Sequence, residues 1–134
     1  MRRNSKLTLG DYTIHYSNPK GKGSFGKVYL AEKTSDYSVY ACKEIKKQAN
    51  LIDIERELSI LKKMAEIRHP NIMRLFHYVE HENVIYLFLQ LCDMNLKQFL
   101  SQRKRLGEHE AIYYFDQILA GVDALHSFDI MHRD

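Results

Sequence analysis

The sequence predicts an α+β fold, in which a five-stranded antiparallel sheet with one helix is followed by a mainly helical segment. Runs of β-branched and aromatic residues, bounded by Gly, Ser, Asn or Pro, fill the first two thirds of the chain. They come as three strands, a helical stretch and two more strands, and their short connections favour antiparallel neighbours. Beyond residue 92 the apolar residues recur at steps of three and four, which is the helical period.

The strands are expected at residues 12–16, 28–32, 39–45, 72–78 and 84–91. The helix between the third and fourth strands is expected at 51–64, because one apolar stripe is formed there by Leu51, Ile54, Leu58 and Leu61. A short helix at 96–102 and a long one at 108–127 follow; the stripe of the long helix consists of Ala111, Phe115, Ile118, Val122 and Leu125. Residues 1–11 are polar and basic, and we expect a flexible arm there.

Bulk composition excludes several classes of protein. The 134 residues suffice for one modest domain, and the 20 Lys and Arg against 17 Asp and Glu leave a net charge of only +3. The basic residues are scattered, so no nucleic-acid partner is expected. No stretch approaches the roughly 18 to 20 apolar residues of a membrane span. Cys42 and Cys92 lie in apolar runs without a secretory signal, which favours an intracellular, cytoplasmic protein without a disulfide.

A glycine-rich stretch, Gly21-Lys22-Gly23-Ser24-Phe25-Gly26-Lys27-Val28, fits the pattern G-x-G-x-x-G-x-V. Such glycines let backbone N–H groups approach phosphate oxygens without interference from a side chain. A plain glycine-rich hairpin would give the same pattern, as would a dinucleotide-binding loop. The dinucleotide loop should open a helix after its third glycine, whereas here the β-type run Val28-Tyr29-Leu30 follows.

Lys43 lies inside an apolar strand, Tyr40-Ala41-Cys42-Lys43-Glu44-Ile45, where it shares one face with Ala41. Under a glycine-rich loop it could reach phosphate oxygens, although a lone strand lysine is more often a solvated edge residue. A carboxylate that pairs with Lys43 would favour its interpretation as a phosphate-binding lysine. Glu57 and Glu55 both border the apolar stripe of the following helix, and helix geometry alone leaves both open. The final His132-Arg133-Asp134 has little meaning by itself.

Together, these residues resemble the eukaryotic protein kinase family, whose signatures include a G-x-G-x-x-G-x-V loop, V-A-I-K on a strand, a helix glutamate and H-R-D. The similarity runs from residue 12 to 134. It includes the phrases Arg68-His69-Pro70-Asn71-Ile72 and Ala124-Leu125-His126, which look more like the serine/threonine branch than the tyrosine branch. The resemblance implies a kinase-like N-lobe with hinge at 12–92 and the start of an incomplete C-lobe at 93–134.

By this resemblance the chain is the ATP-binding part of an enzyme that transfers the γ-phosphate of ATP to Ser/Thr hydroxyls of a protein substrate. Lys43 would hold the α and β phosphates while ion-paired to Glu57, leaving Glu55 on the surface. Asp134 would accept the substrate proton, and Arg133 would steady its loop. The nucleotide would lie against residues of the loop, an apolar slot and the hinge: Gly21, Lys22, Gly23, Ser24, Phe25, Gly26, Val28, Ala41, Leu89, Gln90 and Cys92.

Two departures from the family pattern accompany this match. The sequence stops at Asp134, so the family's protein ligands for Mg²⁺ lie beyond it, and we expect no kinase activity from this chain alone. The alternative is a catalytically incomplete remnant that acts as a nucleotide- or protein-binding module. Phe115, Ile118 or Val122 should be partly exposed. Pro19-Lys20, with a lengthened segment at 12–21, leaves the register of the first strand open.

Overall fold

The computed structural model describes residues 5–23, 26–47 and 51–132, although the side chains of residues 22, 23, 51–55 and 57 are not described. The chain divides into two compact units. One consists of Met1–Ala65 and Arg74–Leu91, and the other of Glu66–Met73 and Cys92–Asp134. The loop at 66–73, which the sequence grouped with the strands, belongs to the helical unit, where the Asn71 side-chain amide donates to Gln117 Oε1 at 3.3 Å.

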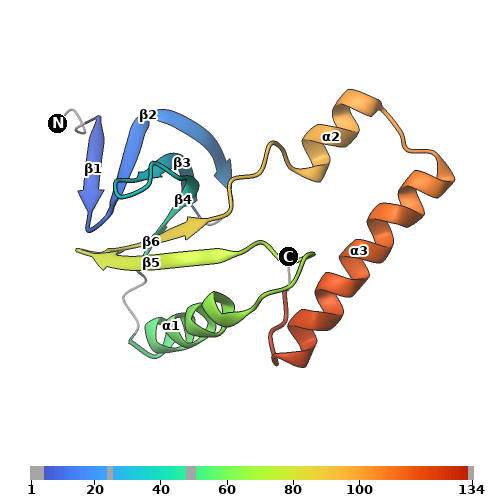
Figure 1. The fold of residues 1–134 in the computed structure, drawn as a ribbon. Helices are drawn as coiled ribbons and strands as arrows, with labels where there is room; N and C mark the ends of the chain where they lie inside the picture. Colours follow the sequence, from blue (N-terminus) through green and yellow to red (C-terminus); the bar gives the residue numbers. More distant parts are fainter. Residues whose placement is uncertain (1–4, 24–25, 48–50, 133–134) are drawn as a thin grey trace. The chain divides into compact units, whose positions relative to one another are not determined.

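Within the described residues, the first unit contains an antiparallel sheet of six strands in the order β1-β2-β3-β4-β6-β5 (Figure 1). Its strands are β1 Lys6–Leu9, β2 Tyr12–Gly23, β3 Gly26–Lys33, β4 Val39–Lys46, β5 Leu75–His81 and β6 Val84–Leu89, and helix α1, Leu51–Glu66, follows β4. The predicted order of three strands, one helix and two strands is confirmed for β2 to β6.

The sequence predicted five strands and a flexible arm at residues 1–11, but residues 6–9 form an additional strand, β1. Lys6–Leu9 pairs with β2, from Lys6 opposite His15 to Leu9 opposite Tyr12. Gly10 allows the tight turn between them, because its φ of +58° is strained for other residues. The isolated stretch has too few apolar residues to form a core, but Leu9 becomes buried against the sheet. Packing within the sheet therefore stabilises a strand that the local composition does not predict.

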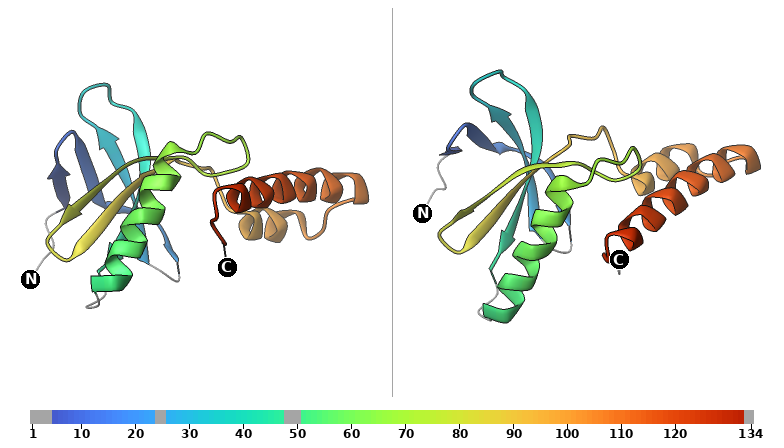
Figure 2. Two further views of the ribbon diagram at one scale, coloured as in Figure 1. Left: turned by 90° about the horizontal axis from the view of Figure 1, so that it is seen from below. Right: turned by 60° about the horizontal axis from the view of Figure 1, so that its bottom comes forward.

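Two apolar clusters cover the two faces of the sheet. One is rich in aromatic residues: Tyr12 stacks on Phe88 with ring centroids 4.1 Å apart, and both belong to the cluster around buried Ile14 and Cys42. The other joins Ile85 and Leu87 of β6 to Leu61 of α1. Helix α1 therefore packs on one face only, and Figure 2 shows it along the β5 and β6 side of the sheet.

Two strands differ from their predicted bounds by more than two residues. The fourth predicted strand, at 72–78, instead runs from Leu75 to His81, because Ile72 lies in a loop where its N–H donates to the carbonyl of His69. The first predicted strand, at 12–16, continues to Gly23 as β2.

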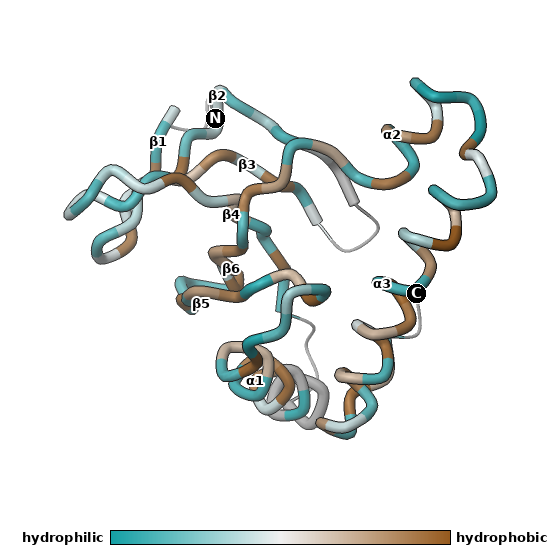
Figure 3. Tube along the Cα trace, turned by 45° about the vertical axis from the view of Figure 1, so that its right-hand side comes forward, coloured by the Kyte–Doolittle hydropathy of each residue, from teal (hydrophilic) through white to brown (hydrophobic). Residues whose placement is uncertain are grey.

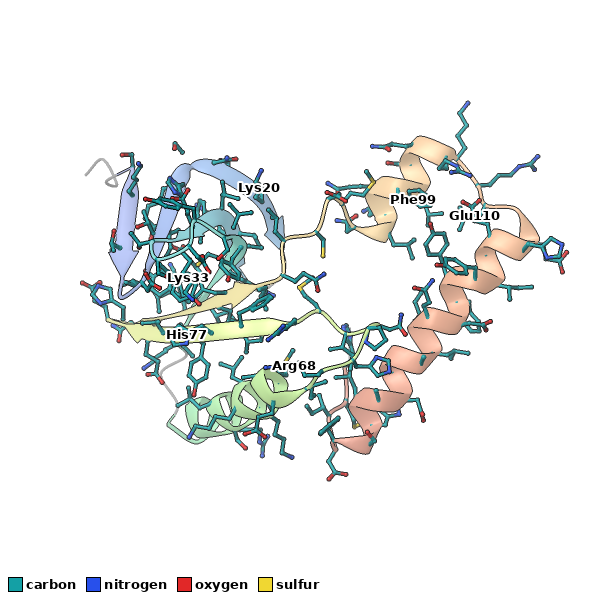
Figure 4. The ribbon with its side chains drawn as sticks, in the orientation of Figure 1. Lys20, Lys33, Arg68, His77, Phe99 and Glu110 are labelled. Carbon is teal, nitrogen blue, oxygen red and sulfur yellow. The ribbon has the colours of Figure 1, made fainter. Side chains whose placement is uncertain are left out.

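The second unit contains α2 (Leu96–Arg103) and α3 (Glu108–Ser127). Asn95 caps α2 in a reciprocal capping box with Gln98. Where the helices face each other, Phe99 lies edge-on to Tyr114 at 5.5 Å, and Arg103 pairs with Glu110 at 3.0 Å (Figure 4).

Helix α3 packs on the loop at 66–73 through Gly121 and Gln117, not through the centre of its apolar stripe. Phe115 and Ile118 are 57% and 48% exposed, as predicted from the sequence. Figure 3 shows apolar residues recurring along this helix. Among the described residues, no helix combines the length and apolar character that crossing a membrane requires.

Candidate functional site

The glycine-rich stretch forms the end of the β2–β3 hairpin. Gly21 lies opposite Val28, and Gly23 lies opposite Gly26. A strand continues on both sides of the glycines, so the dinucleotide-binding interpretation, which needs a helix here, is wrong. Ser24 and Phe25 lie outside the described residues, and only the backbone of Lys22 and Gly23 is described.

The register of β2 contains two irregularities before the glycines. Four residue steps from His15 to Pro19 match one step on β3, and two steps from Pro19 to Gly21 match one more. Bulges of this kind absorb extra residues while the ladder resumes beyond them. The departure at Pro19-Lys20 is therefore taken up before Gly21, and the glycines still pair with β3.

Gly26 is required by close packing of the backbone. Its φ of +155° is rarely adopted by residues with a side chain, and a Cβ added there would lie 1.9 Å from the carbonyl oxygen of Glu44. At Gly21 an added Cβ would have no neighbour within 4 Å. Gly21 and Gly26 thus have different structural roles, which the sequence pattern could not distinguish.

Lys43 lies on β4, between Val28 of β3 and Leu87 of β6. Because β4 is hydrogen-bonded on both sides, Lys43 is not the solvated edge lysine that the sequence left open. It is half-buried. Ala41 lies on the same face, opposite Leu89. The structure therefore brings Val28, Ala41, Lys43 and Leu89 together on neighbouring strands.

Helix α1 covers the face of the sheet that carries Lys43. Ile45 shares that face and packs with Leu58 and Leu61 of α1 in one cluster. Glu57 immediately precedes Leu58 on this helix, but its side chain is not described, and neither is that of Glu55. The pairing of Lys43 with Glu57 stays a prediction.

The opposite face of β4 carries buried groups that the sequence did not single out. Burial, and secondarily the charge of Glu44, raise the pKa of the Cys42 thiol to about 12. Burial also raises the pKa of Tyr16, and hydrogen bonds to Tyr86 and Glu44 raise it further. From the sequence, only the alternation of side chains along the strand indicated a position for Glu44, on the face away from Lys43.

The segment after β6 was expected to offer backbone groups to an adenine ring. The N–H of Gln90 donates to the carbonyl of Arg74 at 3.0 Å, and the contact of this segment with adenine stays a prediction. Cys92, where the chain re-enters the second unit, is exposed and forms no disulfide within the part of the chain that the structure describes. Arg133 and Asp134 lie outside the described residues, so their catalytic roles stay predictions.

Comparison with known proteins decides the family. The model of the protein kinase domain matches residues 15–134. The chain belongs to the protein kinase family. Its six-stranded antiparallel sheet with helices is consistent with a kinase N-lobe followed by early C-lobe helices, which confirms the predicted fold class.

Curated kinases are similar to this kinase segment over most of its length. Serine/threonine-protein kinase PLK4 from Xenopus tropicalis is 36% identical over 121 residues, which cover 87% of the chain and 13% of that protein. The same kinase from Danio rerio is 34% identical over 118 residues, covering 85% and 13%. The carbon catabolite-derepressing protein kinase of Saccharomyces cerevisiae is 34% identical over 137 residues, covering 97% and 21%. The chain thus spans about an eighth to a fifth of the length of these relatives.

Proposed function

We propose that this chain is the ATP-binding part of a protein kinase that transfers the γ-phosphate of ATP to Ser or Thr hydroxyls of a protein substrate. The observation that carries the proposal is the placement of Lys43. It lies half-buried on a central strand, in register with Val28 of the glycine-rich hairpin, in a chain that matches the kinase domain over residues 15–134. The similarity to PLK4, which is named a serine/threonine-protein kinase, supports the serine/threonine assignment.

The described residues fit a nucleoside triphosphate. The glycine hairpin offers main-chain N–H groups with little side-chain bulk at Gly21, and Lys43 offers a cation on the neighbouring strand. Ala41 and Leu89 are cross-strand neighbours, which gives an apolar surface suited to the flat face of an adenine ring. Glu57 would hold the Lys43 ammonium in position, Asp134 would accept the substrate proton, and Arg133 would steady the loop of Asp134.

Magnesium ions would neutralise charge on the phosphates during transfer. The D-F-G aspartate and the catalytic-loop asparagine, which hold these ions in the family, are not among the 134 residues. For a polypeptide of these residues alone, we therefore expect nucleotide binding without turnover. An assay in which purified polypeptide phosphorylates a protein substrate, with the signal abolished in Lys43→Met, would contradict this expectation.

A calorimetric titration with ATP and Mg²⁺ tests the nucleotide site. Lys43→Met removes the cation and should weaken binding by about tenfold or more, because charge-assisted contacts to phosphate are strong. Lys46→Met is the matched control, since it removes the same charge from an exposed position on the same strand. Equal affinities of the two variants, or no binding by the unsubstituted chain at millimolar ATP, would refute the proposal.

A further inference from the structure

We infer that Glu44 is a positioning residue that fixes the glycine-rich hairpin relative to the strand that carries Lys43. The inference rests on the proposed role of the hairpin and Lys43 in phosphate binding. Glu44 is adjacent to Lys43 on β4, but its side chain is buried on the opposite face. It therefore does not itself approach a nucleotide bound on the Lys43 face.

The side chain of Glu44 links β4 to β2. It is hydrogen-bonded to Tyr16, which is also hydrogen-bonded to Tyr86, the cross-strand neighbour of Glu44 on β6. The ring of Tyr16 lies edge-on to Tyr29 of β3, with centroids 4.9 Å apart. Tyr16 thus reaches across β3 to contact the strand that carries Lys43.

Tyr16 is located where the pairing of β2 with β3 is interrupted. It directly follows His15, the last residue in register before the three extra residues of the first bulge. Bulged residues lose their pairing with the neighbouring strand, so beyond His15 the ladder with β3 does not define the path of β2, and on the other side the Tyr16 N–H donates to the carbonyl of Ser5 at 2.9 Å. The contact between Tyr16 and Glu44 supplies a fixed point just before the chain enters the glycine-rich stretch.

The main chain of Glu44 contacts the other strand of the hairpin. Its carbonyl oxygen would lie 1.9 Å from a Cβ at Gly26, so the backbones approach each other more closely there than a side chain would permit. One residue therefore touches both strands of the hairpin, β2 through its carboxylate and β3 through its carbonyl. Glu44 also follows Lys43 directly in the chain. Glu44 therefore positions both groups that we propose to bind phosphate, the backbone of the hairpin and the ammonium group of Lys43.

Amide hydrogen exchange of the full chain without nucleotide tests the inference independently of ligand binding. In Glu44→Ala, the paired hairpin residues 21–23 and 26–28 should exchange about tenfold faster, while β5 and β6 stay protected. Tyr16→Phe removes the same link from the other side, keeps the ring against Tyr29, and should give the same selective effect. Glu44→Gln can still accept a hydrogen bond from Tyr16 and should restore protection.

Cys42→Ala is the matched control, because Cys42 is a fully buried neighbour on the same face of β4 that packs in the aromatic cluster. A general loss of core packing should accelerate exchange throughout the unit in this variant, without singling out the hairpin. If Glu44→Ala and Tyr16→Phe behave like Cys42→Ala, or if Glu44→Gln does not restore protection, the positioning role is refuted.

ATP titrations of the same variants add a second readout. Glu44→Ala should bind ATP about five- to tenfold more weakly than Glu44→Gln at a temperature where both are folded, because misplaced binding groups lose affinity. Unchanged affinity in folded Glu44→Ala would contradict the inference. If the unsubstituted chain binds no ATP, the proposed function fails, and hydrogen exchange alone still decides whether Glu44 positions the hairpin.

Discussion

Replacing Gly26 by alanine should destabilise the first unit strongly. The added Cβ would lie 1.9 Å from the carbonyl oxygen of Glu44, and observed Cβ contacts essentially never fall below 3.0 Å. The two backbones must therefore separate by at least 3.0 − 1.9 = 1.1 Å. A shift of this size at the end of the hairpin disturbs the neighbouring ladder pair, Val28 with Lys43.

The cost has two parts. An alanine at φ +155° carries about 1–3 kcal/mol of backbone strain. Loss of two ladder hydrogen bonds adds roughly 1 kcal/mol each. The sum is about 3–5 kcal/mol, which is large for a single substitution. In a unit of this size, each kcal/mol lowers Tm by about 4–8 °C, so the melting temperature should fall by more than about 10 °C.

Urea unfolding followed by circular dichroism measures the effect. Gly21→Ala is the matched control within the same motif, because its added Cβ meets nothing within 4 Å and its φ lies outside the strained positive range. We expect Gly21→Ala to stay within about 1 kcal/mol of the unsubstituted chain. If Gly26→Ala is as stable as Gly21→Ala, the close approach of β3 to Glu44 is not a constraint on the fold.

Three further predictions concern other parts of the molecule. Gly121→Ala should destabilise the helical unit by about 1–3 kcal/mol, since its Cβ would lie 2.6 Å from the Asn71 carbonyl oxygen; unchanged hydrogen exchange in α3 would contradict this. A thiol reagent at neutral pH should label Cys92 but not Cys42, whose pKa is raised to about 12 by burial, and mass spectrometry should find both labelled only after unfolding. The free energy of unfolding should fall as pH rises above 10, because the pKa of Tyr16 is raised from 10.0 in the folded state. The folded state therefore holds the Tyr16 proton more tightly than the unfolded state does. The resulting stabilisation is present below pH 10 and is lost as pH rises above it. Urea unfolding from about pH 9 to about pH 11 should show a shallower decline for Tyr16→Phe.

Local signals were sufficient for the helices. The bounds of α3, Glu108–Ser127, agree with the predicted 108–127, because a glycine precedes a long run at helical spacing. The apolar stripe of that helix was also predicted, but its contact surface was not. Gly121 faces Asn71 because a glycine permits close approach, and no periodicity of apolar residues reports that.

The conformations predicted from sequence were wrong where tertiary contacts override the local conformational preference of the chain. Lys6–Leu9 has weak strand character alone, yet it completes the sheet because Leu9 is buried beside Tyr12 and Ile14. Ile72 looks like a strand residue, but its loop packs with the helical unit. In both cases contacts made in the folded unit, and not the local preference of the segment, decided the conformation.

For the candidate site, the sequence alone determined the motifs, their order, and the face of β4 on which Lys43 and Ala41 lie, because strand alternation is a local property of the chain. Only the tertiary structure decided that β4 is a central strand, that Gly26 must approach Glu44, and that Tyr16 and Glu44 meet across β3. These contacts join residues far apart in sequence, and they depend on the pairing register and the bulges of β2, which a pattern of residue types does not specify.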